Sequence, residues 1–146
     1  MSKEASERLR RLVATRAYHV CEYCLIHEDD TFWGCQVDHI ISRKHGGALD
    51  GENLAWACAV CNNHKGSDLG SLAGKPPRLV RFFHPRTDCW ADCFQLVQVR
   101  IEALDDRGAA TEMMLQLNRD SRLRERTTLA LIGRYPTIEA LARMKE

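Results

Sequence analysis

Four of the seven cysteines stand in two short pairs, Cys21-x2-Cys24 and Cys58-x2-Cys61. A Cys-x2-Cys turn places two thiolates on one side of a tight loop, and two such turns can complete a tetrahedron around Zn²⁺. A disulfide framework is the weaker explanation, because the N-terminus shows no secretory signal and an odd cysteine count leaves one thiol unpaired. The spacing therefore predicts a structural zinc site made of Cys21, Cys24, Cys58 and Cys61.

Two alternatives to this zinc site stay open. The four thiols could be buried or redox-active without a metal, and either His27 or His64, each three residues after a zinc cysteine, could replace one of them as ligand. The remaining cysteines are expected to pack in the core, although the spacing of the last two could also serve a metal. These are Cys35, Cys89 and Cys93.

The segment between the cysteine pairs holds a carboxylate, an imidazole and amides that could do hydrolytic chemistry. Cleavage of a phosphodiester needs a base that activates water and a hard cation that neutralises charge on the phosphate. His39 could be the base, and the side-chain oxygens of Asp38 and Asn62 suit Mg²⁺ or Mn²⁺. Lys65 could hold a neighbouring phosphate. Each residue also has a simpler reading: Asp38 and His39 as a structural pair, Asn53 as a turn cap, and Lys65 as a solvated cation.

Taken together and in this order, the motifs resemble the HNH endonuclease family of the ββα-metal class, in its short stand-alone bacterial form. The matching features cover residues 21–66 and comprise the two cysteine pairs, Val37-Asp38-His39-Ile40, Gly46-Gly47, Asn53-Leu54 and Asn62-x2-Lys65-Gly66. The resemblance implies a metal-dependent endonuclease, a phosphodiester hydrolase that acts on DNA.

The resemblance also implies a role for each residue. His39 would be the general base, Asp38 and Asn62 would ligate the catalytic cation, and Asn53 would stabilise the loop and orient the base. The implied cofactors are structural Zn²⁺ and a catalytic Mg²⁺ or Mn²⁺. Because the position of Asn62 is held by His or Asn in the family, Ni²⁺ is an alternative for the catalytic ion.

The distribution of charge says more than the net charge of +1. Four cations and no acid occur in residues 69–87, and the first predicted helix carries several arginines, among them Arg8, Arg10 and Arg11. Such stretches can contact phosphates, although they can also be solvated faces. The residues expected to contact DNA are Lys65, Arg43, Lys44, Arg78 and Arg81.

No apolar run approaches the roughly 20 residues that span a bilayer, so we expect no membrane partner and a cytoplasmic protein. The oligomeric state stays open.

The pattern of apolar residues predicts an α+β fold. A helix is expected over 3–20, where Arg16 lies on the apolar stripe with its head group aimed at a partner. A short strand over 32–37, a second strand that starts or ends at 40–41, a turn at 46–47 and a helix from 58 to about 69 would form a ββα-metal finger within an HNH core of residues 1–72. Residues 73–146 would be a linker over 74–77 and an extension packed on the core, with strands in 94–104 and helices near 109–117, 120–132 and 137–144.

A second class of function remains open from the sequence. The chain could be a zinc-stabilised nucleic-acid-binding module that has lost catalysis. The set Asp38, His39 and Asn62 separates the two hypotheses, and its presence favours the enzyme.

Overall fold

A computed structural model describes residues 2–146, apart from the side chain of Ala5. The first helix, α1 (Lys3–Arg16), ends four residues before the predicted limit. Tyr18 and His19 take positive φ values of 54° and 62°, which stop a right-handed helix and turn the chain back. Val20 then forms a β-bridge with His27, and this closes the first cysteine pair into a compact loop.

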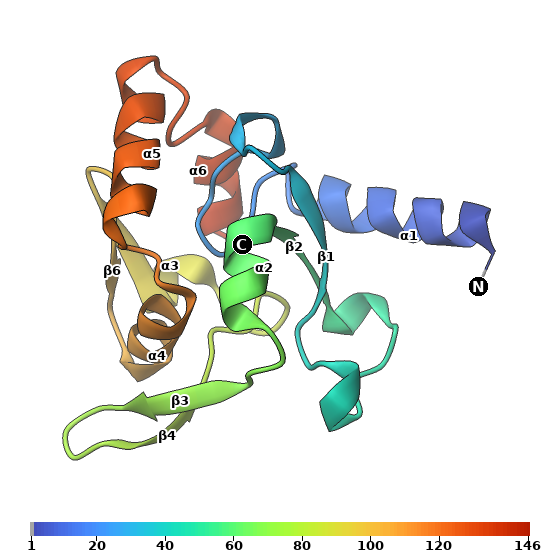
Figure 1. Ribbon diagram of the computed structural model, residues 1–146, viewed down its shortest axis with the longest axis horizontal. Helices are drawn as coiled ribbons and strands as arrows, with labels where there is room; N and C mark the ends of the chain where they lie inside the picture. Colours follow the sequence, from blue (N-terminus) through green and yellow to red (C-terminus); the bar gives the residue numbers. More distant parts are fainter. Residues whose placement is uncertain (1) are drawn as a thin grey trace.

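The predicted ββα unit is formed by β1 (Cys35–His39), β2 (Leu54–Cys58) and α2 (Ala59–Lys65). The first strand begins three residues later than predicted, and the second lies at 54–58 and not at the expected 40–41. The strands are antiparallel, with Cys35 opposite Cys58 at one end and His39 opposite Leu54 at the other. The hairpin lies between α1 and α2 (Figure 1). Because side chains alternate along a strand, neighbours in β1 point to opposite faces of this hairpin.

Helix α2 is shorter than predicted because of Gly66. The sequence predicts a helix to about Leu69, but the helix ends at Lys65 and Gly66 has φ +54°. This conformation is accessible mainly to glycine, and it turns the chain away from the helix axis.

The linker predicted at residues 74–77 is instead the turn of a hairpin, which corrects the sequence interpretation. Strands β3 (Gly70–Ala73) and β4 (Arg78–Arg81) pair antiparallel, and the prolines occupy the turn, where no ladder hydrogen bond is needed. This hairpin projects at the lower end of the molecule (Figure 1). The boundary expected between residues 72 and 73 therefore falls inside β3.

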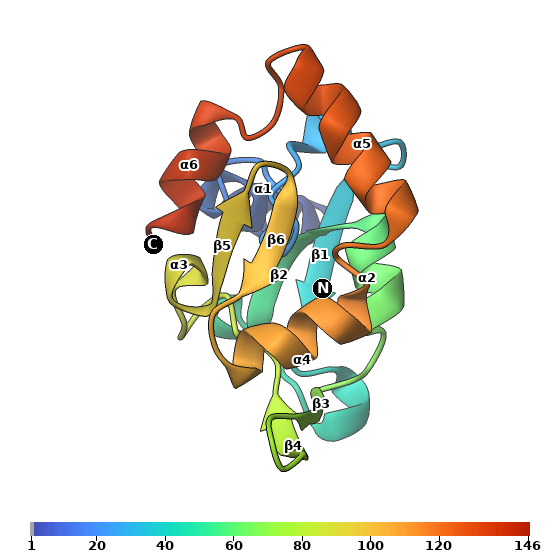
Figure 2. The same ribbon diagram turned by 90° about the vertical axis from the view of Figure 1, so that its left-hand side faces the viewer.

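The C-terminal half contains the predicted strands and helices. A short helix, α3 (Trp90–Cys93), precedes a hairpin of β5 (Phe94–Val97) and β6 (Arg100–Ala103), and three helices follow. These are α4 (Asp106–Leu115), α5 (Asp120–Leu131) and α6 (Ile138–Met144), the last capped by the Thr137 side chain as predicted. Helix α4 packs against β3 and β6, so the two halves share one body (Figure 2).

A row of buried aromatic rings joins the two halves. Tyr23, in the first cysteine loop, meets Phe83 edge-on with ring centroids 6.2 Å apart, and Phe83 meets Phe94 at 5.5 Å. Trp90 lies against Phe94 at 5.0 Å. Edge-on contacts of this kind add to the hydrophobic stabilisation of a core. Within residues 2–146 no helix is long and apolar enough to cross a membrane.

Candidate active site and metal centre

The four predicted zinc cysteines converge at one point in the core. Their Sγ atoms all lie within 4.8 Å of one another, and all four residues are buried. Cys24 Sγ and Cys58 Sγ are 3.8 Å apart, which matches the edge of a ZnS₄ tetrahedron with Zn–S bonds of about 2.3 Å. The cysteine cluster therefore fits a structural zinc ion. The two alternative histidines lie outside it: His27 caps a turn at Asp29, and His64 Nδ1 contacts the Leu115 carbonyl at 2.9 Å.

The remaining cysteines do not join this cluster. Cys35 and Cys93 are buried, as the packing expectation requires, and Cys89 is half-buried with its thiol against the Met144 carbonyl. Burial is the main cause that raises the pKa of Cys93 to about 12, so this thiol is neutral at ordinary pH.

A buried arginine from α5 supplies positive charge to the cysteine cluster. Arg122 Nη2 lies 3.0 Å from Cys24 Sγ and 3.5 Å from Cys58 Sγ, and its other terminal nitrogen contacts Glu125 at 2.9 Å. Burial on its own raises the pKa of the Cys24 thiol. Hydrogen bonds from the other three cysteines and the charge of Arg122 more than offset this effect, so the pKa is lowered. The site therefore favours thiolate at Cys24, the form that binds zinc.

The C-terminal half also donates two hydrogen bonds to the backbone of the first cysteine loop. Tyr135 Oη donates to the Cys24 carbonyl at 2.8 Å, and Trp90 Nε1 donates to the Tyr23 carbonyl at 3.0 Å. Both donors are buried. The extension thus fixes the loop that presents two of the four cysteines.

The Asp38 carboxylate is enclosed and already has partners. Its side chain is 4% exposed, Tyr23 Oη donates to Oδ2 at 3.0 Å, and Lys65 Nζ lies 3.3 Å from each carboxylate oxygen. Burial raises the pKa of Asp38, and the charge of Lys65 together with the Tyr23 hydrogen bond opposes the rise without cancelling it. Lys65 is 2% exposed and also donates to the His39 carbonyl at 3.0 Å.

These contacts alter the interpretation of two predicted site residues. The ammonium of Lys65 stands beside Asp38 where a cation ligated by Asp38 would have to lie, and among the described residues only the four cysteines form a group of three or more ligands suited to a metal. In this arrangement the Asp38 carboxylate is occupied by Lys65 and Tyr23, and its role with Asn62 as a cation ligand stays a prediction. Lys65 is a core residue here and does not face a phosphate, which corrects the expectation of a DNA contact.

His39 ends β1 on the face of the hairpin opposite Asp38. Its ring is half-buried, and its Nε2 atom is enclosed without a hydrogen-bond partner. The loop that follows is held by Asn53, whose side chain accepts from Ile41 N at 2.8 Å and donates to the Ile41 and Ala48 carbonyls at 2.9 Å each. These bonds fix the backbone just after the imidazole.

Gly47 is required for this loop to pack. A Cβ atom at Gly47 would lie 1.6 Å from the Ile41 carbonyl oxygen, closer than any real contact. Gly47, the second glycine of the sequence motif, therefore permits the close approach that Asn53 bridges.

The predicted DNA contacts fall into two groups. Arg43 and Lys44 are exposed in a short turn four and five residues after His39. Arg78 forms an ion pair with Asp106 at 3.0 Å, and Arg81 pairs with Asp88 at 2.7 Å. Arg43 and Lys44 are thus better placed to meet a phosphate than the two arginines of β4. Asn62, in α2, is half-buried.

The sequence does not predict the roles of two residues near the site. Tyr23 lies inside the first Cys-x2-Cys pair, but nothing in its type or spacing ties it to Asp38. Arg122 lies 98 positions after Cys24, in a helix whose sequence carries no metal motif. Tyr23 reaches Asp38 through the fold of the cysteine loop on the hairpin, and Arg122 reaches the cluster through the packing of the extension.

Comparison with known proteins bears on the same segment. Residues 21–68 match the family model described as HNH endonuclease. No curated protein and no solved structure matches the chain. The matched residues include the cysteine cluster, the β1–β2 hairpin and α2, in an α+β fold. Residues 21–68 therefore form a domain of the HNH endonuclease family, which indicates a nuclease or nucleic-acid-binding function for this part of the chain.

Proposed function

We propose that this protein is an endonuclease that hydrolyses phosphodiester bonds in DNA, with His39 as the base that activates water. The observation that carries the proposal concerns His39, which lies in the matched HNH segment. Its Nε2 atom has no hydrogen-bond partner within the protein, and hydrogen bonds from Asn53 hold the backbone of the loop that follows it. A base must have a nitrogen that can accept a proton, and His39 Nε2 makes no hydrogen bond within the protein.

The proposed reaction needs few groups from this chain. The His39 imidazole takes a proton from water, the water oxygen forms a bond to phosphorus, and the opposite P–O bond breaks. The leaving oxygen takes a proton from solvent. Arg43 and Lys44 would hold the phosphates on either side of the scissile one. Because Asp38 is engaged by Lys65, no step is assigned to a cation at Asp38 and Asn62.

Zinc has a purely structural part in this proposal. Four thiolates fill a tetrahedral ion and leave no position for water. Cys21 and Cys24 would be joined through it to Cys58 and Cys61, at the junction of β2 and α2. We further propose that residues 73–146 are an extension that supports this core, because Trp90, Arg122 and Tyr135 all contact the first cysteine loop.

One observation favours the second hypothesis, a nucleic-acid-binding module without catalysis. The carboxylate expected to bind the catalytic cation is held by Lys65 and Tyr23 in the core. A protein with this arrangement could bind DNA through its surface cations and cut nothing.

Plasmid nicking separates the two functions. Zinc-loaded protein is incubated with supercoiled plasmid in EDTA, Mg²⁺, Mn²⁺ or Ni²⁺, and His39→Ala is compared with His45→Ala, which removes an exposed imidazole six positions later. We expect nicking by the wild type and by His45→Ala, and a loss of about 10²–10⁴-fold in His39→Ala. Equal rates in both variants would exclude His39 as the base. DNA binding without nicking under any of these conditions would establish the binding module instead, and nicking that survives EDTA would exclude a weakly held catalytic cation.

A further inference from the structure

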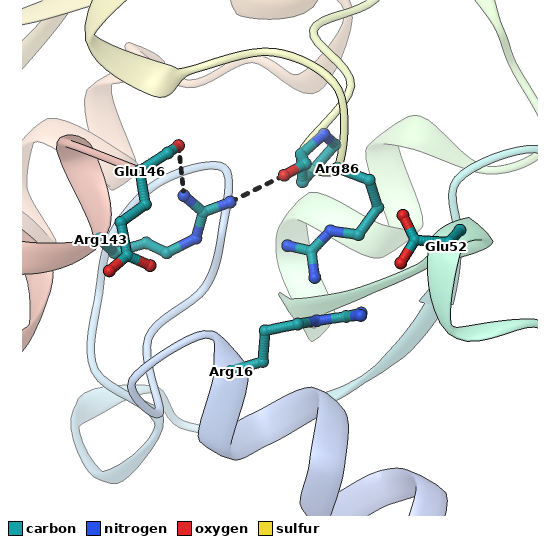
Figure 3. A pocket seen from close by; sticks show the side chains of 6 residues that line it. Arg16, Glu52, Arg86, Arg143 and Glu146 are labelled. Atoms are coloured by element: carbon teal, nitrogen blue, oxygen red, sulfur yellow. Dashed lines mark hydrogen bonds between the residues drawn. The ribbon is translucent and has the colours of Figure 1, made fainter.

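Three arginines line a pocket beside β2 that the proposed reaction does not use. The arginine pocket has a volume of about 240 Å³ and is formed by Arg16, Glu52, Pro85, Arg86, Arg143 and Glu146. Figure 3 shows the guanidinium groups converging from α1, from the loop after β4 and from α6. Segments distant in the sequence thus bring three positive charges to one place.

The inner wall of the arginine pocket carries more positive than negative charge. Glu22 is fully buried behind it and pairs with Arg86 and with Arg143, the latter at 2.9 Å. On this inner wall one buried carboxylate faces three guanidinium groups. Glu52 and Glu146 are exposed at the rim, and their carboxylates oppose part of this positive charge.

Two of the arginines also have hydrogen-bonding groups without partners. Arg16 Nη2 donates to the Leu54 carbonyl at 2.8 Å and Arg86 Nη2 donates to Glu22, but the Nε atoms of both residues are enclosed and make no hydrogen bond. The Arg86 side chain is 6% exposed, so bulk water does not satisfy it. Arg143, by contrast, uses each of its three nitrogens, on Glu22, Pro85 and Glu146.

We infer that the arginine pocket binds a phosphate group. A phosphate monoester carries a charge of about −1.5 to −2, and it offers several oxygens to the planar guanidinium donors of the three arginines. The pocket lies next to the end of the hairpin that holds His39, because Arg16 binds the carbonyl of Leu54 and Leu54 pairs with His39. That the phosphate belongs to DNA rests on the proposed function, whereas the binding of phosphate itself does not.

Inorganic phosphate is the first probe of the arginine pocket. The zinc-loaded full chain is titrated at constant ionic strength, and the Nε–Hε resonances of the arginines are followed by NMR. We expect saturable shifts for Arg16 and Arg86 and smaller ones for Arg143. Arg16→Gln should weaken binding about tenfold, since charged hydrogen bonds are strong. Shifts that do not saturate, or that chloride reproduces, would overturn the inference.

A rim variant keeps the test independent of folding. Glu52→Gln removes an exposed negative charge next to Arg86, so phosphate should bind about twofold to threefold more tightly. The matched control is Glu4→Gln, which also removes an exposed acid. Glu4 lies about 18 Å from Arg16 along α1, which is farther than the distance over which salt screens exposed charges. Equal affinities for the two variants would show that the pocket does not hold phosphate.

Oligonucleotides then identify the source of the phosphate. His39→Ala protein is titrated with one duplex that carries either a 5′-phosphate or a 5′-hydroxyl. Larger Arg86 shifts with the 5′-phosphate assign a terminal phosphate to the pocket, and equal shifts assign the internal backbone. If inorganic phosphate binds and neither duplex shifts Arg86, the pocket stands and its link to DNA fails.

Discussion

The guanidinium of Arg122 donates to Cys24 Sγ at 3.0 Å, although the two residues are 98 positions apart in the chain. Four thiolates around Zn²⁺ carry a net charge of −2, and taking that charge into a core is unfavourable unless a cation accompanies it. Arg122 is that cation, and it also reaches Cys58. Helix α5 is therefore part of the metal centre as well as of the extension.

Removing this charge should loosen the zinc ion. Because a hydrogen bond to a charged group contributes about 1.5–3 kcal/mol, Arg122→Gln should release zinc at least about tenfold faster than the wild type. Transfer of zinc to a chromophoric chelator measures the rate. Arg124→Gln is the matched control, since Arg124 lies two residues away on the exposed side of α5. Indistinguishable release from both variants would mean that Arg122 only fills space.

Loss of zinc should unfold the HNH domain. The four cysteines are buried and converge from two segments of the chain, so metal binding supplies folding free energy. Cys58→Ser should therefore lower the melting temperature sharply and bind less than one zinc per chain. Cys35→Ser is the comparison, because Cys35 is buried outside the cluster. The prediction fails if elemental analysis finds no zinc in the wild type, or if both serine variants melt alike.

The sequence predicted those parts of the molecule that depend on local spacing. Two Cys-x2-Cys turns define the cluster, because ligand spacing acts over a few residues, and the predicted strand over 32–37 overlaps β1. The head group of Arg16 does meet a partner, the Leu54 carbonyl, as its place on the apolar stripe predicted.

The parts that sequence reasoning missed depend on long-range packing or on backbone conformation. Two consecutive prolines suggest a linker equally well as a hairpin turn, and only the pairing of β3 with β4 decides. Lys65 follows the family motif, so a phosphate contact was a reasonable expectation. Its burial against Asp38 follows from the place of α2 on the hairpin, which no local pattern specifies.

The buried pair of Asp38 and Lys65 should be strongly coupled. Removing one partner leaves the other charge buried without compensation, so Asp38→Leu and Lys65→Met should each lower the free energy of unfolding by about 3–5 kcal/mol. The double variant should lose much less than the sum, because no unpaired charge remains. Urea unfolding of the zinc-loaded proteins gives all four corners of this cycle. Additive losses would show that the ion pair is not formed in solution.

Asp88 predicts how stability depends on pH. Its side chain is 5% exposed. The carboxylate accepts hydrogen bonds from Arg81 at 2.7 and 3.0 Å, from Arg107 at 2.8 Å and from the backbone N–H of His84 at 2.9 Å. Burial alone raises the pKa of Asp88, but the hydrogen bonds from Arg81 and His84 and the two positive charges outweigh it, so the pKa is lowered in the folded protein. A carboxylate with a lowered folded pKa stabilises the fold above its unfolded pKa of about 3.9, and that contribution disappears as the pH falls through the folded pKa.

Replacing Asp88 with asparagine should therefore lower the free energy of unfolding by about 2 kcal/mol at pH 7, in line with the loss of charged hydrogen bonds. The loss should become progressively smaller below about pH 4. Because acid also protonates the zinc thiolates, the comparison is made with Asp92→Asn, a neighbouring exposed acid that shares that effect. Urea unfolding of the two variants should differ by the full amount at pH 7 and converge at low pH. A difference that stays constant with pH would mean that Asp88 acts through packing and not through its charge.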